Sequence, residues 1–152
     1  KGENSISLYI AQSNERPPMP ALQYPMMLCG NFALGADDEL IADNPSAITY
    51  WDKCGSPYYS GVGSYFFDIL LADACKELWL DLGDIRESAK IIINGEIAVT
   101  RAWPPYRIKV RAPWRRGMNR IEIRVANTLS NLWDRTRRKS GMSGSVRIRP
   151  DT

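Results

Sequence analysis

Apolar and polar residues alternate along most of the stretch from Tyr58 to Asn131, which is the pattern of strands that bury one face. Leucine occupies every second position over residues 78–82, and isoleucine or valine does so over residues 121–125. Gly, Pro and Asn separate these segments, as tight turns between neighbouring strands require. The stretch has no helical periodicity. The pattern therefore predicts an all-β fold in which these strands keep one face in water.

The clearest local signal is a hairpin centred on Asn94-Gly95. Residues 89–93 lead into this dipeptide and residues 96–100 lead out of it. Asn and Gly tolerate the positive φ angles of a type I′ turn, whose twist matches that of the flanking strands. We therefore predict a two-residue turn, with Ile91 and Ile93 directed into the core.

Shorter strands are predicted on both sides of this stretch. They cover residues 5–11, residues 24–34 with an interruption at Gly30, residues 48–51, residues 65–71 and residues 146–148. Residues 65–71 are largely apolar, which is typical of a strand covered on both faces. Residues 129–139 are polar and cationic and indicate a loop or a short helical turn. About eight to ten short strands without a long helix predict a sandwich of two sheets.

Six short motifs then follow one another in the order of a known domain type. They are Y-S-G-x-x-x-Y at residues 59–65, D-L-G-D-I at 81–85, A-x-I-x-I-N-G at 89–95, W-P-P-Y at 103–106, G-x-N-x-I-x-I-x-V-x-N at 117–127 and S-G-x-x-G-x-V-R-I at 140–148. In this order they resemble the galactose-binding-like jelly-roll domain of glycoside hydrolases, as in family 2 β-galactosidases and family 106 α-L-rhamnosidase-like bacterial glycosidases. The resemblance covers residues 46–149.

The resemblance implies an antiparallel jelly-roll β-sandwich of the galactose-binding-domain-like type. A length of 152 residues suits one domain. We therefore expect residues 1–152 to form a single domain, to which residues 1–45 add N-terminal strands and loops. The chain opens on Lys1 without a signal-like segment and contains no apolar run long enough to span a membrane. We expect a piece of a larger multidomain protein, and the resemblance implies a periplasmic or secreted location.

Catalytic chemistry has little support in the composition. Histidine is absent, which removes the usual general base, the Ser-His and Cys-His nucleophile pairs and the commonest metal ligand. Carboxylates occur, but the sequence does not place any two of them across a cleft as glycoside hydrolysis requires. In the family that the chain resembles, the acid and the nucleophile belong to a separate domain. We therefore expect no catalytic residue and no enzymatic activity of the chain by itself.

Metal and redox sites are also not expected. The acidic residues between Asp37 and Asp43 form either a solvated loop or a calcium site, although their spacing is not that of an EF-hand. Cys29, Cys54 and Cys75 match no zinc or redox spacing. They are thiols in strands or, in an oxidising compartment, include one disulfide. We expect no cofactor and no bound metal.

Charge is divided unevenly between the two parts of the chain. Residues 1–100 contain 6 basic and 14 acidic side chains, whereas residues 101–152 contain 14 basic and 3 acidic ones. Either acidic and basic strands lie side by side and offset one another, or a basic face meets an acidic partner domain or an acidic glycan. The residues of that face are Arg107, Lys109, Arg111, Arg115, Arg116 and the run from Arg135 to Lys139. No nucleic-acid recognition motif accompanies these arginines.

Aromatic side chains at or near loops are the candidates for carbohydrate binding, because a sugar ring packs its C–H surface against an aromatic face. They are Trp51, Tyr58, Tyr59, Trp103, Tyr106 and Trp114, with Trp133 as a further candidate. Trp103 either packs under the hairpin or faces an adjoining domain. Tyr65 and Trp79 lie within strands and are interpreted as packing residues. Asn127 and Asn131 end a strand and are interpreted as groups that bind buried backbone.

Three hypotheses on function follow. The first is a non-catalytic accessory or carbohydrate-binding β-sandwich domain of a multidomain glycoside hydrolase, with the catalytic domain of the parent chain as its partner. The second is an independent carbohydrate-binding module that targets a polysaccharide or oligosaccharide. The third is an enzyme in its own right, which the absence of histidine disfavours.

Overall fold

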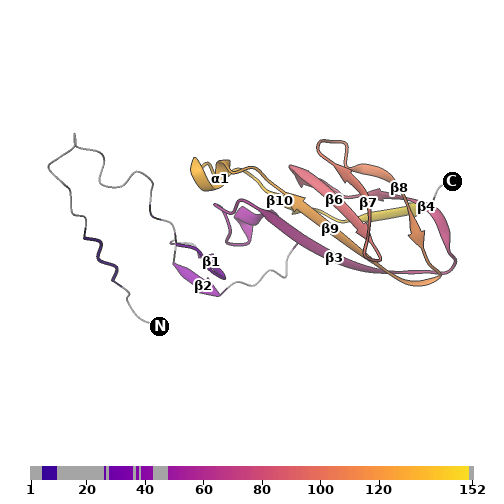
Figure 1. Cartoon of the computed structure of the whole chain (residues 1–152), viewed down its shortest axis with the longest axis horizontal. Coiled ribbons are helices and arrows are strands. Elements are labelled where there is room, and N and C mark those ends of the chain that lie inside the picture. The colour runs from indigo at the N-terminus through magenta and orange to yellow at the C-terminus, as the bar shows by residue number, and fades with distance from the viewer. Residues whose placement is uncertain are drawn as a thin grey trace. The chain divides into compact units, whose positions relative to one another are not determined.

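The computed structural model describes residues 5–9, 26, 28–35, 37, 39–42 and 48–150 (Figure 1). The chain divides into two compact units, Lys1–Gly30 and Asn31–Thr152. The single domain expected over residues 1–152 stays a prediction. In the first unit, the strand predicted over residues 5–11 is wrong for residues 5–9, while residues 10 and 11 lie outside the described ranges. A strand needs a partner for its backbone N–H and C=O groups, and Ile6 and Tyr9 expose their side chains instead of packing.

The second unit contains the regular structure. Its described elements are β1 (Phe32–Leu34), β2 (Leu40–Ala42), the 3₁₀ helix η1 (Trp51–Lys53), β3 (Val62–Leu71), β4 (Cys75–Asp81), β5 (Asp84–Arg86), β6 (Ser88–Ile93), β7 (Glu96–Arg101), β8 (Arg107–Trp114), β9 (Gly117–Ala126), α1 (Ser130–Trp133), β10 (Gly141–Ser143) and β11 (Arg147–Pro150). Strands dominate, and the short helical turn that was one alternative for residues 129–139 is present as α1. The predicted all-β class is confirmed.

The strands form antiparallel sheets that pack as a sandwich. One sheet has the order β3-β9-β6-β7 and another has the order β11-β4-β8. Two smaller sheets pair β10 with β5 and β1 with β2. Neighbours in these sheets are often distant in sequence, as where β3 pairs with β9 over ten residues from Val62 opposite Ala126 to Leu71 opposite Gly117. This order and the antiparallel pairing confirm the predicted jelly-roll sandwich.

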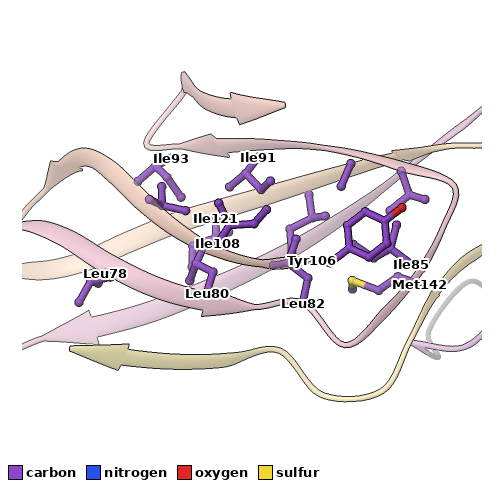
Figure 2. Close-up of a cluster of buried hydrophobic side chains, with 14 of the residues drawn as sticks. Leu78, Leu80, Leu82, Ile85, Ile91, Ile93, Tyr106, Ile108, Ile121 and Met142 are labelled. Carbon is purple, nitrogen blue, oxygen red and sulfur yellow. The ribbon is translucent and has the colours of Figure 1, made fainter. Parts of the chain in front are cut away.

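The core lies between the four-stranded and the three-stranded sheet (Figure 2). Leu80 of β4 and Leu82, which directly follows β4, belong to the same core cluster as Ile91 of β6 and Ile123 of β9, and all four side chains are fully buried. The alternation predicted over residues 78–82 and 121–125 is therefore confirmed, because every second residue of a strand points to the same face.

The predicted hairpin is also confirmed. Ile93 of β6 pairs with Glu96 of β7, which leaves Asn94 and Gly95 as the two turn residues, with φ angles of 52° and 90°. Asn94 also joins the hairpin to β9, because its Oδ1 accepts a hydrogen bond from the backbone N–H of Arg120 at 3.0 Å. Asn94 therefore adopts the positive φ angle that the turn requires and also binds the backbone of the neighbouring strand β9.

Two strand predictions before β3 need correction. Residues 48–51 are not a strand, since Tyr50 makes a single bridge to Gly141 and η1 follows. The carbonyl of Trp51 accepts hydrogen bonds from the N–H groups of Cys54 and Ser56, so the chain closes into a turn that keeps the Trp51 ring in the core. Of the described residues between 24 and 34, β1 alone is a strand, so the part predicted before Gly30 is wrong at residues 26, 28 and 29. Residues 24, 25 and 27 lie outside the described part.

The prediction that both faces of residues 65–71 are covered is wrong for the described structure. Along β3, half-buried and exposed positions alternate, and Phe66 and Leu70 are more than half exposed on the outer face. β3 lies at the end of the four-stranded sheet with β9 as its partner, and the described residues place no element over this outer face. The apolar composition of β3 thus exceeds what burial within the sandwich requires.

Candidate functional site

The six predicted carbohydrate-binding aromatics divide into two groups. Trp51, Tyr106 and Trp114 are buried members of the core cluster. The Trp114 Nε1 donates to the Val110 carbonyl at 3.2 Å, and the Tyr106 hydroxyl donates to the Glu87 carbonyl. Burial raises the pKa of Tyr106. Rings enclosed in this way have no face available for a sugar. The prediction of carbohydrate binding therefore stays open for Tyr58, Tyr59 and Trp103.

Tyr58, Tyr59 and Trp103 reach the surface. Tyr59 is 43% exposed and packs edge-to-face on Trp51, with ring centroids 4.9 Å apart. Its hydroxyl donates to the Val62 carbonyl at 2.9 Å, which holds the ring at the entry to β3. Trp103 is 69% exposed and belongs to a separate loop, between β7 and β8. Of the two alternatives for Trp103, the exposure favours a ring that faces outward.

A polar framework supports the loops around Tyr59. Asn127 Nδ2 donates to the Tyr59 carbonyl at 2.8 Å, and its Oδ1 accepts from the Gly61 N–H at 2.8 Å. Asn131 is buried and binds both the carbonyl and the N–H of Arg138, at 2.9 Å and 2.8 Å. The interpretation of both asparagines as groups that bind backbone is confirmed.

A polar hollow of about 440 Å³ opens beside this framework. Its lining residues are Leu34, Gly35, Asp52, Lys53, Gly55, Pro57 and Arg137. Arg137 Nε donates to the Tyr58 hydroxyl at 2.8 Å, and the guanidinium lies 4.9 Å from the centre of the Tyr58 ring. Asp52 Oδ1 is buried and has no hydrogen-bond partner among the residues that the structure describes. A carboxylate, an ammonium and a guanidinium thus surround a space in which hydroxyl groups of a ligand can be bound.

Sequence reasoning did not find this hollow. Arg137 follows α1 and is 79 residues from Tyr58 along the chain, so no local pattern joins the two. Asp52 gave no signal beyond its charge, because it follows the strand predicted over residues 48–51 and η1 was not expected. The backbone of Arg137 adopts a φ of 48°, which is rare for residues other than glycine and is not marked in the sequence.

A second polar cluster lies around Asp84 at the start of β5. The Tyr50 hydroxyl donates to Asp84 Oδ2, and Arg86 Nη2 lies 3.0 Å from the same oxygen. The hydrogen bond from Tyr50, and after it that from Arg86, hold the pKa of Asp84 below its ordinary value. The hydrogen bond with Asp84, and after it burial, raise the pKa of Tyr50. Lys139 places its ammonium 5.3 Å from the centre of the Tyr50 ring. The cluster is satisfied by its own members and joins the end of the sandwich to the segment after α1.

The predicted basic face is divided in the structure. Arg107, Lys109 and Arg111 share the outer face of β8, whereas Arg115 and Arg116 belong to the turn between β8 and β9. The residues from Arg135 to Lys139 follow α1. Offsetting pairs are present as well, since Glu77 of β4 contacts both Lys109 and Arg111. Acidic and basic strands therefore offset one another in part, and contact between a basic face and an acidic partner or glycan stays a prediction.

Metal and thiol groups add no further site. Asp38 and Asp43 of the predicted acidic turn lie outside the described residues, so the calcium question stays a prediction. Within the described ranges, no three His, Cys, Asp or Glu side chains come together as metal ligands. Cys29 is an exposed thiol, and Cys54 and Cys75 are half-buried thiols.

The described strands form an antiparallel β-sandwich, and comparisons with known proteins show which chains it is similar to. No family model matches the chain. The curated protein named "Putative beta-glucuronidase" from Formosa agariphila is 29% identical over 119 residues, which are 72% of this chain and 10% of that protein. The solved rhamnosidase from Novosphingobium sp. PP1Y is 28% identical with a TM-score of 0.58, over 76% of this chain and 14% of that one. The β-D-glucuronidase of Dictyoglomus thermophilum is 18% identical with a TM-score of 0.45, over 63% and 18% of the chains.

These comparisons locate the resemblance within much larger chains. This chain spans about a tenth of the length of the curated relative and 14% of the rhamnosidase. The predicted resemblance to a domain of glycoside hydrolases is therefore confirmed. The chain is similar to one part of such enzymes.

Proposed function

We propose that this chain is a non-catalytic accessory domain of a multidomain glycoside hydrolase and that it supports the catalytic domain of that enzyme. The observation that carries the proposal is the outer face of the sheet β3-β9-β6-β7. Five apolar side chains on this face are each more than half exposed. They are Val62, Phe66, Leu70, Ile97 and Met118, and together they are called the apolar face below.

The strand register places these side chains in every second row of the outer face, and the polar rows that contain Ser64 and Asp68 lie between them. Leu70 of β3 lies opposite Met118 of β9. One complete row crosses the sheet from Phe66 through Glu122 and Ile92 to Ile97. Exposed apolar groups that share one face mark an interaction surface more often than isolated ones do. The apolar face therefore suits a protein partner that removes it from water.

The edge of the same sheet supports this reading. β3 is ten residues long and contains one ionised side chain, Asp68. Among the described strands it pairs with β9, so its other edge presents unpaired backbone groups. Long apolar edge strands pair with other chains unless an element covers them or charges interrupt them. A domain packed against β3 within the same enzyme would supply that cover.

The apolar face also has a hollow beside it that side chains of a partner can fill. A hollow of about 440 Å³ adjoins Val62 and is lined by Ser64, Lys90, Thr100 and Arg124, among others. Arg124 is paired with Glu122 at 2.6 Å, and this carboxylate has a lowered pKa because of that hydrogen bond. Interfaces commonly combine an apolar centre with polar groups of this kind at its rim.

The test uses the full-length enzyme that contains this chain. Leu70→Asp should lower the midpoint of thermal unfolding of that enzyme and make the domain more accessible to a protease. Leu129→Asp is the matched control, because Leu129 is 61% exposed and lies outside the apolar face. If both variants behave like the wild type, the proposed contact is refuted. The isolated chain should not hydrolyse aryl glycosides, and turnover that one Asp or Glu substitution abolishes would refute the non-catalytic role.

The second candidate function is carbohydrate binding, and the polar hollow at Asp52 and Arg137 favours it. Asp52, Lys53 and Arg137 line this hollow and offer polar groups to the hydroxyls of a sugar. Asp52→Asn should then reduce retention on a polysaccharide column while the unfolding midpoint changes little. Retention that is the same for both proteins, or absent in both, would exclude this site.

A periplasmic or secreted location belongs to the same proposal and rests on the resemblance to glycoside hydrolases alone. Among the described residues, no helix has the length and apolar character needed to cross a bilayer. Fractionation of cells that express the full-length enzyme tests the location directly.

A further inference from the structure

The outer face of the sheet β11-β4-β8 is cationic. Alternate residues of β8 and β11 place five exposed basic side chains on it, and β4 runs between these two strands. The members of this cationic face are Arg107, Lys109 and Arg111 of β8, Arg147 and Arg149 of β11, and the half-buried Glu77, Trp79 and Asp81 of β4.

Trp79 lies at the centre of the cationic face. In the register of the sheet it is opposite Arg149 on one side and opposite Lys109 on the other. The guanidinium carbon of Arg107 is 5.8 Å from the centre of the Trp79 ring. An aromatic ring is thus surrounded by cations from both neighbouring strands.

The two carboxylates do not neutralise this surface. Glu77 lies 2.8 Å from Lys109 Nζ and 2.6 Å from Arg111 Nη2, and these hydrogen bonds lower its pKa. Asp81 is in register between Arg147 and Arg107 and accepts a hydrogen bond from the Gly83 N–H at 3.2 Å. Five basic groups against these two acids leave an excess of positive charge around Trp79, and it is greatest at Arg107, Arg147 and Arg149.

We propose that the cationic face binds a polyuronate, a polysaccharide whose sugar rings carry carboxylates. The C–H surface of one sugar ring would pack on Trp79, and its carboxylate would accept hydrogen bonds from Arg149 or Arg107. Guanidinium groups bind carboxylates through paired, charge-assisted hydrogen bonds, which are stronger than those between neutral groups. The choice of a sugar as the ligand rests on the proposed function.

The dimensions of the face favour a polymer over a single sugar. From Arg107 to Arg111 the cations extend along β8 for roughly 13 Å, given about 3.3 Å per strand residue. This length exceeds one sugar ring, so successive carboxylates of a polyuronate can contact successive cations. An acidic protein surface would use the charges without needing Trp79, whereas a single-stranded nucleic acid would use both, and the experiment separates these ligands.

The experiment measures binding of the 152-residue chain to an oligogalacturonate by calorimetry. The probe should bind, and its fully methyl-esterified form should not, because esterification removes the carboxylate charge. Trp79→Ala, and separately the pair Arg147→Ala with Arg149→Ala, should each raise Kd roughly tenfold or more, as expected when a charge-assisted contact is lost. Trp79→Phe should retain most of the affinity, since it keeps an aromatic ring.

The matched control is the pair Arg115→Ala with Arg116→Ala. This pair removes the same charge from the turn between β8 and β9, outside the cationic face. It should leave Kd within about twofold, since exposed charges at a distance are screened by salt. An equal loss in the control pair would show non-specific attraction and overturn the proposal.

Three other results would also overturn it. They are no binding of the oligogalacturonate, equal binding of polyaspartate that Trp79→Ala does not weaken, and tighter binding of a single-stranded oligonucleotide. Circular dichroism of each variant verifies folding, and the arginine pair tests the site even if Trp79→Ala unfolds the chain. The docking test on Leu70 concerns the opposite sheet. If the cationic face does not bind the polyuronate, the calorimetry fails while the Leu70 result is unchanged, so the two proposals are tested separately.

Discussion

The outer face of β3-β9-β6-β7 and the outer face of β11-β4-β8 share one strand periodicity and differ in chemistry. On the first, Phe66, Leu70 and Met118 expose apolar groups. On the second, Arg107 and Arg149 are representative of five exposed cations. Both sheets direct aliphatic side chains to a common core. The inner faces of the two sheets are therefore alike in their aliphatic side chains. The sheets differ in the side chains of their outer faces.

The difference suggests separate roles for the two faces. An apolar surface gains free energy when any well-fitting protein surface excludes water from it. A charged surface selects its ligand by sign and geometry, and its contacts weaken as salt is added. This contrast is the reason why a permanent contact is proposed for the apolar face and reversible ligand binding for the cationic face.

Truncation in the shared core should have the largest effect. Leu80 of the three-stranded sheet and Ile123 of the four-stranded sheet are both fully buried. Leu80→Ala and Ile123→Ala should each lower the free energy of unfolding by about 2–5 kcal/mol, because each removes buried methyl groups and leaves a cavity. Urea denaturation of the isolated chain measures this. A loss below about 1 kcal/mol at one site only would show that the two sheets do not share one core.

Asn119 should give the next largest effect. It is fully buried and binds the N–H and the carbonyl of Arg115, at 2.9 Å and 2.7 Å, while its Oδ1 also accepts from Asn94. It thus connects the β8–β9 turn of one sheet with the β6–β7 hairpin of the other. Asn119→Ala should cost about 1–3 kcal/mol of unfolding free energy, since buried partners lose their hydrogen bonds. Arg120→Ala, an exposed neighbour, is the control and should be nearly neutral.

Substitution of Glu77 should have the smallest effect on the free energy of unfolding. Its pH dependence tests the ion pairs on the outer face of β11-β4-β8. Hydrogen bonds from Lys109 and then Arg111 hold its pKa below the ordinary value of 4.5. A carboxylate with a lowered folded-state pKa stabilises the fold above its unfolded-state pKa, and this contribution is lost as pH falls through the folded value. The stability difference between wild type and Glu77→Gln should therefore be constant near neutral pH and decrease below pH 4.5. A difference that grows on acidification would contradict the assigned pairing.

Local sequence patterns were sufficient for the strands and for the best-defined turn. Alternation identified the inward residues of β4 and β9, because successive side chains of a strand point to opposite faces whatever the rest of the fold is. Asn94-Gly95 predicted its turn because few other dipeptides adopt two positive φ angles without strain. The order of short motifs also indicated the sandwich type, which the comparisons confirm.

The candidate sites depended on contacts that no local pattern contains. Trp51, Tyr106 and Trp114 looked like the loop aromatics Tyr59 and Trp103, and their burial distinguishes them only after the sheets pack. The hollow near Asp52 exists because the chain after α1 returns to Tyr58. Distances between such residues depend on the topology, which local composition does not encode.

The sequence by itself determined which side chains of each strand share a face, because backbone geometry imposes a period of two. Only the tertiary structure decided which faces meet. Residues 65–71 were apolar enough to suggest burial on both sides, yet among the described residues no element covers the outer face of β3, and Phe66 and Leu70 stay exposed. Likewise, Trp79 acquires Arg149 as a neighbour through pairing between β4 and β11. Strand pairing between distant segments follows from the packing of the whole chain, so these surfaces arise only once the sheets have assembled.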